Sequence, residues 1–174
     1  MIKKLLIVLI LILGIGTKLA YDFFPIKYYD EIVRVSKLEN VDIHIILSMI
    51  KVESNYREKI VSPKGAVGLM QVMPATAEWI LKKNGLNPKD YSLYNAEDNI
   101  FIGTIYFKYL SEKFDGDLEK IMAAYNGGLV RVNNNTWKNI PETNKYVKKI
   151  NLCLKVYQYK LPIYEKIRGI QWKE

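Results

Sequence analysis

The sequence predicts a mostly α-helical protein of one domain. Apolar residues recur at helical spacing along most of the chain, and no two segments show the alternating pattern of paired strands. A chain of 174 residues is long enough for one domain with a substantial core and too short for two ordinary domains. We therefore expect a bundle of about six helices.

The first two helices are separated by a short break. One is expected from Tyr28 to Glu39, and its inward positions are Ile32, Val33, Val35 and Leu38. After the break, Asp42 is a suitable N-cap for the second helix, since its carboxylate can accept a hydrogen bond from the first turn. One stripe of that helix is formed by Ile43, Ile46, Leu47 and Ile50, and Glu53 falls on the flank of this stripe. A carboxyl there is expected at the rim of the core.

The middle of the chain predicts two more helices. Pro74 fits a first helical turn and Asn84-Gly85 a helix end, with a buried face formed by Ala77, Ile80 and Leu81. Asn95 is expected to cap a longer helix, whose core face is Ile102, Ile105, Tyr106, Tyr109 and Leu110. Glu97 and Asp98 lie in its first turn, where negative charge suits the helix dipole, so we interpret them as structural.

The C-terminal part predicts two helices around a polar connection. Asp117 opens a helix over Leu118–Tyr125, which Asn126 and two glycines interrupt. Asn126 has two interpretations, a left-handed C-cap or an amide directed into a cleft. Residues 129–140 are polar and turn-like, and a final helix is expected from Glu142 to Tyr159. The domain is placed at residues 28–160, and residues 161–174 are expected to be a short tail.

Glu53 is the candidate catalytic residue. Partial burial disfavours the charged form of a carboxyl and raises its pKa, so that it can hold a proton near neutral pH and deliver it to a leaving oxygen. A lone glutamate at a helix end is ordinarily an exposed residue. Here a loop with Gly65 and Gly68 follows within the segment Ser62–Pro74, which favours the catalytic interpretation.

Four separated pieces of sequence carry a resemblance to a known family. They are Glu53-Ser54, Gly68-Leu69-Met70-Gln71, Ala124-Tyr125-Asn126, and Glu142-Thr143 with Tyr146-Val147. Together, in this order, they resemble the lytic transglycosylases with the soluble-transglycosylase (SLT) type of catalytic domain. The resemblance covers about Tyr28 to Tyr159 and implies a lysozyme-like helical fold with a saccharide-binding cleft. The connection at residues 129–141 is short for this family, which leaves the number of sugar subsites open.

The resemblance also implies roles for individual residues. Glu53 corresponds to the family's catalytic acid, and Ser62 to a hydroxyl that hydrogen-bonds this carboxyl, although a turn serine is an equal alternative. Tyr146 is expected to orient Glu53 or the acetamido group of the sugar. The remaining expected contacts to saccharide come from Gly68, Gln71, Met73, Tyr125 and Asn126. Met70 is expected in the core.

The implied reaction needs one carboxyl. Hydrolysis of glycosides normally uses two carboxyls. The other acids of the motif regions, including Glu142, lie at helix starts or in turns, where acids commonly serve as caps or dipole partners. By resemblance, Glu53 cleaves the β-1,4 bond between N-acetylmuramic acid and N-acetylglucosamine and forms a 1,6-anhydromuramyl product. A lysozyme-type hydrolase and a catalytically silent wall-binding protein are the alternatives.

The residue inventory excludes other chemistries. His44 is the only histidine, so a His/Cys metal cluster is excluded, and neither a catalytic Ser-His pair nor any metal or other cofactor is expected. His44 itself is interpreted as a solvent-facing helix residue. Cys153, the only cysteine, lies in an apolar-periodic stretch and is expected to be an inert core residue.

The N-terminus predicts export. Two lysines precede an unbroken apolar run from Leu5 to Gly16, which is shorter than the roughly 20 residues of a membrane span and favours a cleavable signal peptide. An uncleaved anchor is favoured by the lack of an alanine-containing cleavage site and by residues suited to the membrane interface, namely Lys18, Tyr21, Phe23 and Phe24. We expect residues 1–24 to anchor the domain outside the cell membrane, with secretion after cleavage as the alternative.

The charge is consistent with this location. The net charge is +8, and lysines and arginines are scattered with no single run. An exported basic protein meets cell-wall polymers and membrane lipid first, so we expect peptidoglycan glycan strands and membrane as partners, and no nucleic acid. A monomer is expected.

Overall fold

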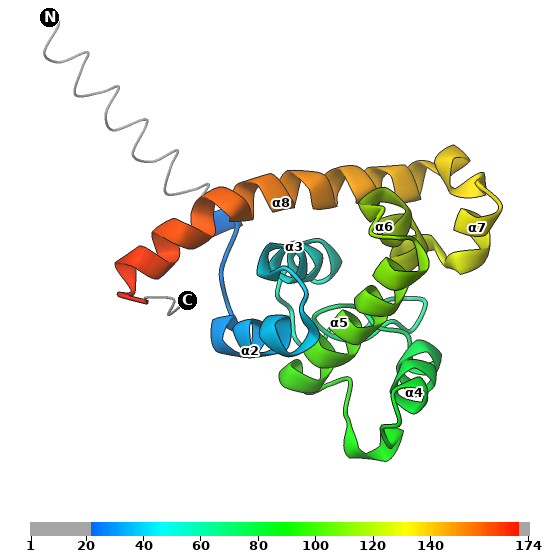
Figure 1. The fold of residues 1–174 in the computed structure, drawn as a ribbon, viewed down its shortest axis with the longest axis horizontal. Helices are drawn as coiled ribbons and strands as arrows, with labels where there is room; N and C mark the ends of the chain where they lie inside the picture. The colour runs from blue at the N-terminus through cyan, green and yellow to red at the C-terminus, as the bar shows by residue number, and fades with distance from the viewer. Residues whose placement is uncertain (1–21, 171–174) are drawn as a thin grey trace, which may run out of the picture.

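The computed structural model describes residues 22–170, and this part of the chain is helical (Figure 1). In chain order the elements are α2 (Tyr29–Glu39), α3 (Ile43–Glu53), α4 (Pro74–Lys83), the 3₁₀ helix η1 (Pro88–Asp90), α5 (Ala96–Lys113), α6 (Leu118–Gly127), α7 (Leu129–Asn133), the 3₁₀ helix η2 (Thr136–Asn139) and α8 (Pro141–Ile167). The only β pairings among these residues are two isolated bridges, Val61 with Val67 and Val67 with Val72. The mostly α prediction is confirmed.

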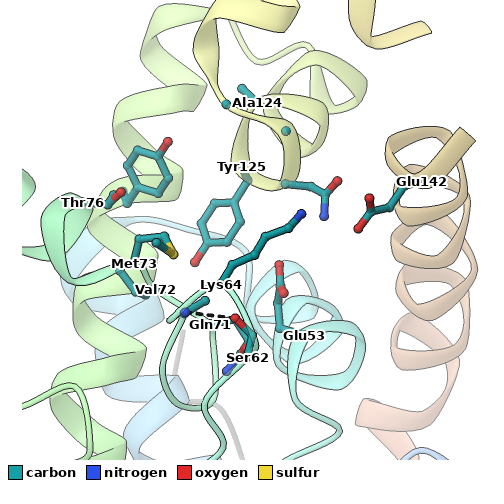
Figure 2. A pocket seen from close by; sticks show the side chains of 15 residues that line it. Glu53, Ser62, Lys64, Gln71, Val72, Met73, Thr76, Ala124, Tyr125 and Glu142 are labelled. Atoms are coloured by element: carbon teal, nitrogen blue, oxygen red, sulfur yellow. Dashed lines mark hydrogen bonds between the residues drawn. The ribbon is translucent and has the colours of Figure 1, made fainter. Parts of the chain in front are cut away.

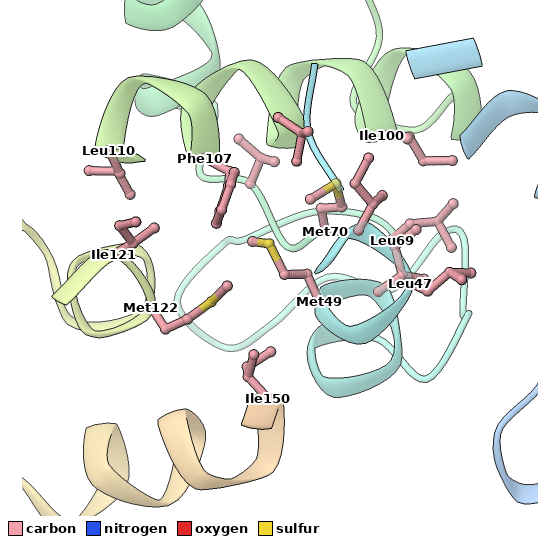
Figure 3. Packing of buried hydrophobic residues seen from close by; sticks show 14 of the residues in the cluster. Leu47, Met49, Leu69, Met70, Ile100, Phe107, Leu110, Ile121, Met122 and Ile150 are labelled. Atoms are coloured by element: carbon pink, nitrogen blue, oxygen red, sulfur yellow. The ribbon is translucent and has the colours of Figure 1, made fainter. Parts of the chain in front are cut away.

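The long helix α8 runs along one side of the molecule, and α3 lies beneath it, seen nearly end-on in Figure 1. α3 and α6 both pack against α8, while α2 and α4 pack against α5. The core between them is filled by side chains from α3, α5, α6 and α8 and from the loop after α3 (Figure 3). Met49, Met70 and Met122 are fully buried there, as expected for Met70. Flexible thioethers suit the irregular space where helices cross.

The predicted helix caps are confirmed. Asp42, Asn95 and Asp117 each precede a helix, and their side chains accept hydrogen bonds from the backbone N–H groups of His44, Asp98 and Lys120, respectively. These bonds satisfy N–H groups that have no partner within the helix. The start of the Glu53 helix is therefore fixed by its own sequence.

Two predictions at helix faces and ends are wrong. Leu38 is 62% exposed, because it lies about 60° around α2 from the buried Val35 and beyond the edge of the core. α8 continues past Tyr159 to Ile167 and includes part of the expected tail. Burial of Leu161 and a hydrogen bond of 2.6 Å from the hydroxyl of Tyr29 to the carboxylate of Glu165 hold the extension against α2.

The connection expected to be turn-like is partly helical, since it contains α7 and η2. Buried Val132 and Trp137 attach these short elements to the core. The apolar run at residues 5–16 lies outside the described residues. None of the helices in the described range is long and apolar enough to cross a membrane.

Candidate active site

A cleft of about 460 Å³ opens at the C-terminal end of α3 (Figure 2). Its walls come from the loop after α3, the start of α4, the middle of α5, the end of α6 and the start of α8. The lining residues are Glu53, Ser62, Lys64, Ala66, Gln71, Val72, Met73, Thr76, Tyr106, Ala124, Tyr125, Asn126, Gly127, Gly128 and Glu142. The cleft therefore brings together segments that are far apart in the sequence.

Glu53 is the last residue of α3 and is half-buried, as its place on the flank of the apolar stripe predicts. Burial raises the pKa of its carboxyl to about 7. A hydrogen bond of 2.6 Å, donated by the hydroxyl of Tyr146 to Oε1 of Glu53, acts in the opposite direction and lowers this pKa. Desolvation is the larger effect, so the carboxyl can hold a proton at neutral pH.

Tyr146 lies in α8 and is buried, and this burial, together with the nearby carboxyl of Glu53, raises the pKa of its phenol well above the ordinary value. The hydroxyl therefore stays protonated and remains a donor to Glu53. α3 and α8 pack against each other along this contact. The geometry fixes one oxygen of Glu53 and leaves the other side of the carboxyl facing the cleft.

Tyr125 and Asn126 come from the end of α6. The hydroxyl of Tyr125 donates a hydrogen bond of 2.9 Å to the carbonyl of Met70, so this ring joins α6 to the loop after α3. Asn126 lies within α6, and Gly128, with φ of 88°, follows the helix end. The left-handed C-cap interpretation of Asn126 is therefore wrong. Its Oδ1 accepts a hydrogen bond of 3.3 Å from the hydroxyl of Thr143 in α8.

The loop after α3 owes its shape to Gly68 and Gln71. Gly68 has φ of 81°, and a Cβ on it would lie 2.2 Å from Nδ2 of Asn99. Gln71 has φ of 48°, and its amide donates hydrogen bonds to the carbonyls of Ile60 at 3.2 Å and Gly68 at 2.9 Å. A non-glycine residue in this conformation is strained, and the two hydrogen bonds hold it there.

The predicted site residues do not all reach the cleft. Six of them line it, namely Glu53, Ser62, Gln71, Met73, Tyr125 and Asn126. Tyr146 lies behind Glu53, and buried Gly68 packs against Asn99 without lining the cleft. The hydroxyl of Ser62 accepts a hydrogen bond of 3.0 Å from the N–H of Ala66. Its predicted hydrogen bond to Glu53 stays a prediction.

Sequence reasoning missed Lys64, Thr76, Tyr106 and Glu142 as lining residues. Figure 2 shows the Lys64 side chain extending from the loop into the cleft, between Tyr125 and Glu53 in this view, and the Glu142 carboxyl facing the cleft from α8. The sequence contained a signal for Glu142 as a site residue, because Glu142 belongs to one of the four motif pieces. It was assigned to the helix dipole because it occupies the first turn of α8.

Residues considered for other chemistries lie elsewhere. Cys153 is a free, buried thiol, which confirms its prediction as a core residue. The ring of His44 is only partly exposed, and its Nδ1 lies 2.6 Å from Oδ1 of Asp42. Among the described residues, no cluster of three or more His, Cys, Asp or Glu side chains could hold a metal ion.

Comparison with known proteins agrees with the geometry. The family described as Transglycosylase SLT domain matches residues 32–148, which include Glu53 and all of the cleft residues. The chain belongs to this family.

Individual SLT-family relatives are much longer. The soluble lytic murein transglycosylase of Salmonella typhimurium is 36% identical over 118 residues, 66% of this chain and 18% of the relative. Its Escherichia coli counterpart is 33% identical over 156 residues, 78% of this chain and 24% of the relative. The membrane-bound lytic murein transglycosylase C of Edwardsiella ictaluri is 34% identical over 112 residues, 59% of this chain and 31% of the relative. The chain thus spans about a fifth to a third of these proteins.

Solved structures of the family have the same fold. Lytic transglycosylase Slt of Pseudomonas aeruginosa, an inactive mutant in which glutamine replaces one glutamate, has a TM-score of 0.72 and 27% identity over 80% of this chain and 25% of its own. The 70 kDa soluble lytic transglycosylase of Escherichia coli has a TM-score of 0.71 and 30% identity over 79% of this chain and 25% of its own. The described residues therefore have the fold of the catalytic domain implied by the four motif pieces.

Proposed function

We propose that this protein is a peptidoglycan lytic transglycosylase, which cleaves the β-1,4 bond between N-acetylmuramic acid and N-acetylglucosamine. The observation that carries this proposal is Glu53, a carboxyl in a cleft whose pKa is raised to about 7 and which one tyrosine hydroxyl orients. Such a group can act as an acid and then, once it has given up its proton, as a base. The SLT family match and the names of the relatives support the same reaction.

The first step is cleavage. Protonated Glu53 donates its proton to the glycosidic oxygen, the bond from this oxygen to the anomeric carbon of the muramyl unit breaks, and the N-acetylglucosamine unit leaves as an alcohol. The 2-acetamido group of the muramyl unit stabilises the positive charge that develops at the anomeric carbon. The hydroxyl of Tyr146 favours the carboxylate that Glu53 becomes in this step, because it donates a hydrogen bond to Oε1.

The second step closes the product. The Glu53 carboxylate accepts the proton of the muramyl 6-hydroxyl, and the 6-oxygen bonds to the anomeric carbon. The product is a 1,6-anhydromuramyl end, no water is consumed, and Glu53 returns to its protonated form. The attacking hydroxyl is part of the same sugar, so closure has the rate advantage of an intramolecular reaction.

The cleft residues fit a saccharide. Asn126 and Gln71 present amide groups, Met73 and Tyr125 present apolar surfaces, and Ser62 presents a hydroxyl. Sugars need this combination of polar contacts with apolar surfaces for their ring faces. Gly68 supports this wall through its packing against Asn99, so its contribution to sugar binding is indirect.

A test of the proposal compares the wild type with Glu53→Gln on purified sacculi, followed by loss of turbidity. We expect the wild type to digest the sacculi and the variant to leave them intact, because an amide can neither donate the proton nor accept it. An inactive wild type would favour a silent wall-binding protein. A variant with activity within a few-fold of the wild type would remove Glu53 from the mechanism.

Hydrolysis is the second candidate, because Glu142 is another carboxyl that lines the cleft. A lysozyme-type enzyme uses a second carboxylate as nucleophile or base. The discriminating variant is Glu142→Gln, and the readout is the number of reducing ends that borohydride can reduce. A hydrolase that depends on Glu142 would lose these ends and its activity, whereas a transglycosylase forms few of them with either residue.

We also propose that residues 1–24 hold the enzyme at the outer face of the cell membrane, where peptidoglycan is accessible. The apolar run and its flanking residues support an anchor, and the similarity to a membrane-bound relative is consistent with it. Protease added to intact protoplasts should release the domain from the membrane fraction. If the mature protein instead began near Thr17 and appeared in the medium, the segment would be a signal peptide.

A further inference from the structure

The outer face of α8 carries an exposed apolar stripe that the active site does not use. Four large apolar residues on this face are exposed, namely Leu152 (60%), Tyr159 (83%), Ile163 (51%) and Ile167 (74%). At about 100° per residue these positions lie within about 80° of one another on the helix. Single exposed apolar residues are ordinary, but a stripe along one helix face indicates an interaction surface.

The residues beside the stripe are basic. Lys148, Lys155 and Lys166 are exposed and flank it on one side, and Lys149 flanks it on the other. α8 contains only two acids. Glu142 lies at the opposite end in the cleft, and Glu165 is buried and bonded to Tyr29. The exposed surface of the C-terminal half of α8 is therefore apolar and cationic.

The chain that leads back to the N-terminal apolar run is attached to this same part of α8. The hydroxyl of Tyr157 donates a hydrogen bond of 2.9 Å to the carbonyl of Pro25, and Lys160 donates one to the carbonyl of Phe24. The rings of Phe24 and Tyr157 pack edge to face, with centroids 5.9 Å apart. Lys160 lies two helical turns before Ile167, so the attachment borders the apolar stripe. The apolar run at residues 5–16, which is part of the proposed anchor, precedes it closely in the sequence.

We propose that the apolar stripe of α8 docks on the outer leaflet of an anionic lipid bilayer. A helix with apolar residues on one face and lysines along its edges has the composition of helices that lie in the membrane interface. Anionic headgroups complement the lysines, and each basic residue near such a surface strengthens the attraction. A second copy of the chain fits less well, because a symmetric contact through this stripe would bring the flanking lysines of the two copies together.

The consequence is a fixed orientation of the enzyme. Because Phe24 and Pro25 are bonded to α8, only residues 17–23 separate the apolar run from this helix in the sequence, so an anchor in residues 1–24 would bring the stripe close to the bilayer. The cleft residue Glu142 lies about 30 Å along α8 from Ile163, at a rise of 1.5 Å per residue. The cleft is thus held at a constant position relative to the membrane, and the enzyme reaches only glycan strands at that position. This inference rests on the proposed membrane location, but not on the proposed reaction.

The test uses the full chain in vesicles and measures the depth of two positions. In a Cys153→Ala background, Ile163→Cys and, as the matched control, Val130→Cys are each labelled with an environment-sensitive fluorophore. Val130 is 72% exposed on α7, away from the stripe. The vesicles contain about one third phosphatidylglycerol, and the quencher is a lipid brominated on its acyl chains. Digestion of sacculi by each labelled protein in detergent is measured in parallel.

We expect emission from position 163 to fall by about half or more and emission from position 130 to change little, as for an apolar face in the interface. Lys155→Glu with Lys166→Glu should abolish the quenching at position 163, while the protein stays in the vesicles and keeps its digestion activity. Equal quenching at the two positions, or none at position 163, would overturn the proposal. So would dimers in detergent that crosslink through position 163. If none of the labelled proteins digested sacculi while position 163 was still quenched, the result would count against the proposed transglycosylase reaction but would support the docking surface.

Discussion

The substitution Glu53→Gln should make the folded protein more stable at alkaline pH while it abolishes activity. Burial raises the pKa of the Glu53 carboxyl from 4.5 to about 7, so the folded state keeps a proton that the unfolded state has released between these values. The stability contributed by this group is therefore fully present below about pH 4.5 and is lost as pH rises through about 7. Over that interval the loss corresponds to about 3 kcal/mol.

Glutamine has nearly the same shape as glutamic acid, can accept the hydrogen bond from Tyr146 and does not ionise. We expect the two proteins to have similar unfolding free energies near pH 4.5, and the variant to be more stable by about 3 kcal/mol near pH 8.5. Urea unfolding of both proteins across this range measures the difference. Equal stabilities at both pH values would show that Glu53 has an ordinary pKa, and the acid–base argument would fail with it.

Three further substitutions test other contacts. Tyr146→Phe removes the hydrogen bond that lowers the pKa of Glu53, so the alkaline limb of the pH profile for kcat/KM should move up by about one pH unit while activity falls. An unchanged profile would show that Tyr146 does not influence the pKa of Glu53. Gly68→Ala should lower the free energy of unfolding in urea by about 3 kcal/mol or more, because the new Cβ would collide with Asn99. The control Gly65→Ala has a similar φ but open space around the Cβ, and it should lower this free energy by only about 1 kcal/mol. Equal losses for the two variants would contradict the packing argument. Leu161→Ala, beyond the helix end expected from the sequence, should cost about 3 kcal/mol, and a loss near zero would mean that the end of α8 is not part of the core.

Local signals explain most of what the sequence predicted. Helix starts were readable because Asp42, Asn95 and Asp117 act through hydrogen bonds to residues two or three positions away. The buried faces of α3 and α4 followed from spacing alone. The raised pKa of Glu53 followed from its place at the edge of an apolar stripe, and this prediction is confirmed.

The predictions that were wrong or incomplete concern contacts between distant parts of the chain. The length of α8 depends on the contact from Tyr29 to Glu165, which no local pattern reveals. Gly68 was interpreted as a position for close approach of sugar, whereas its neighbour is Asn99 of α5. Glu142 has the ordinary position of an acid in a first helical turn, and only the packing of α8 against α3 and α6 brings it to the cleft.

The mass of the released muropeptides tests the central claim most directly, because it reports the reaction and not only the residue that performs it. We expect digestion of purified peptidoglycan by this protein to yield muropeptides that end in 1,6-anhydro-N-acetylmuramic acid, each lighter by one water than the matching lysozyme product. One carboxyl that acts as acid and then as base, next to a tethered 6-hydroxyl, gives this product. Products dominated by reducing ends, with the mass of one water added, would contradict transglycosylation and assign the protein to the hydrolases.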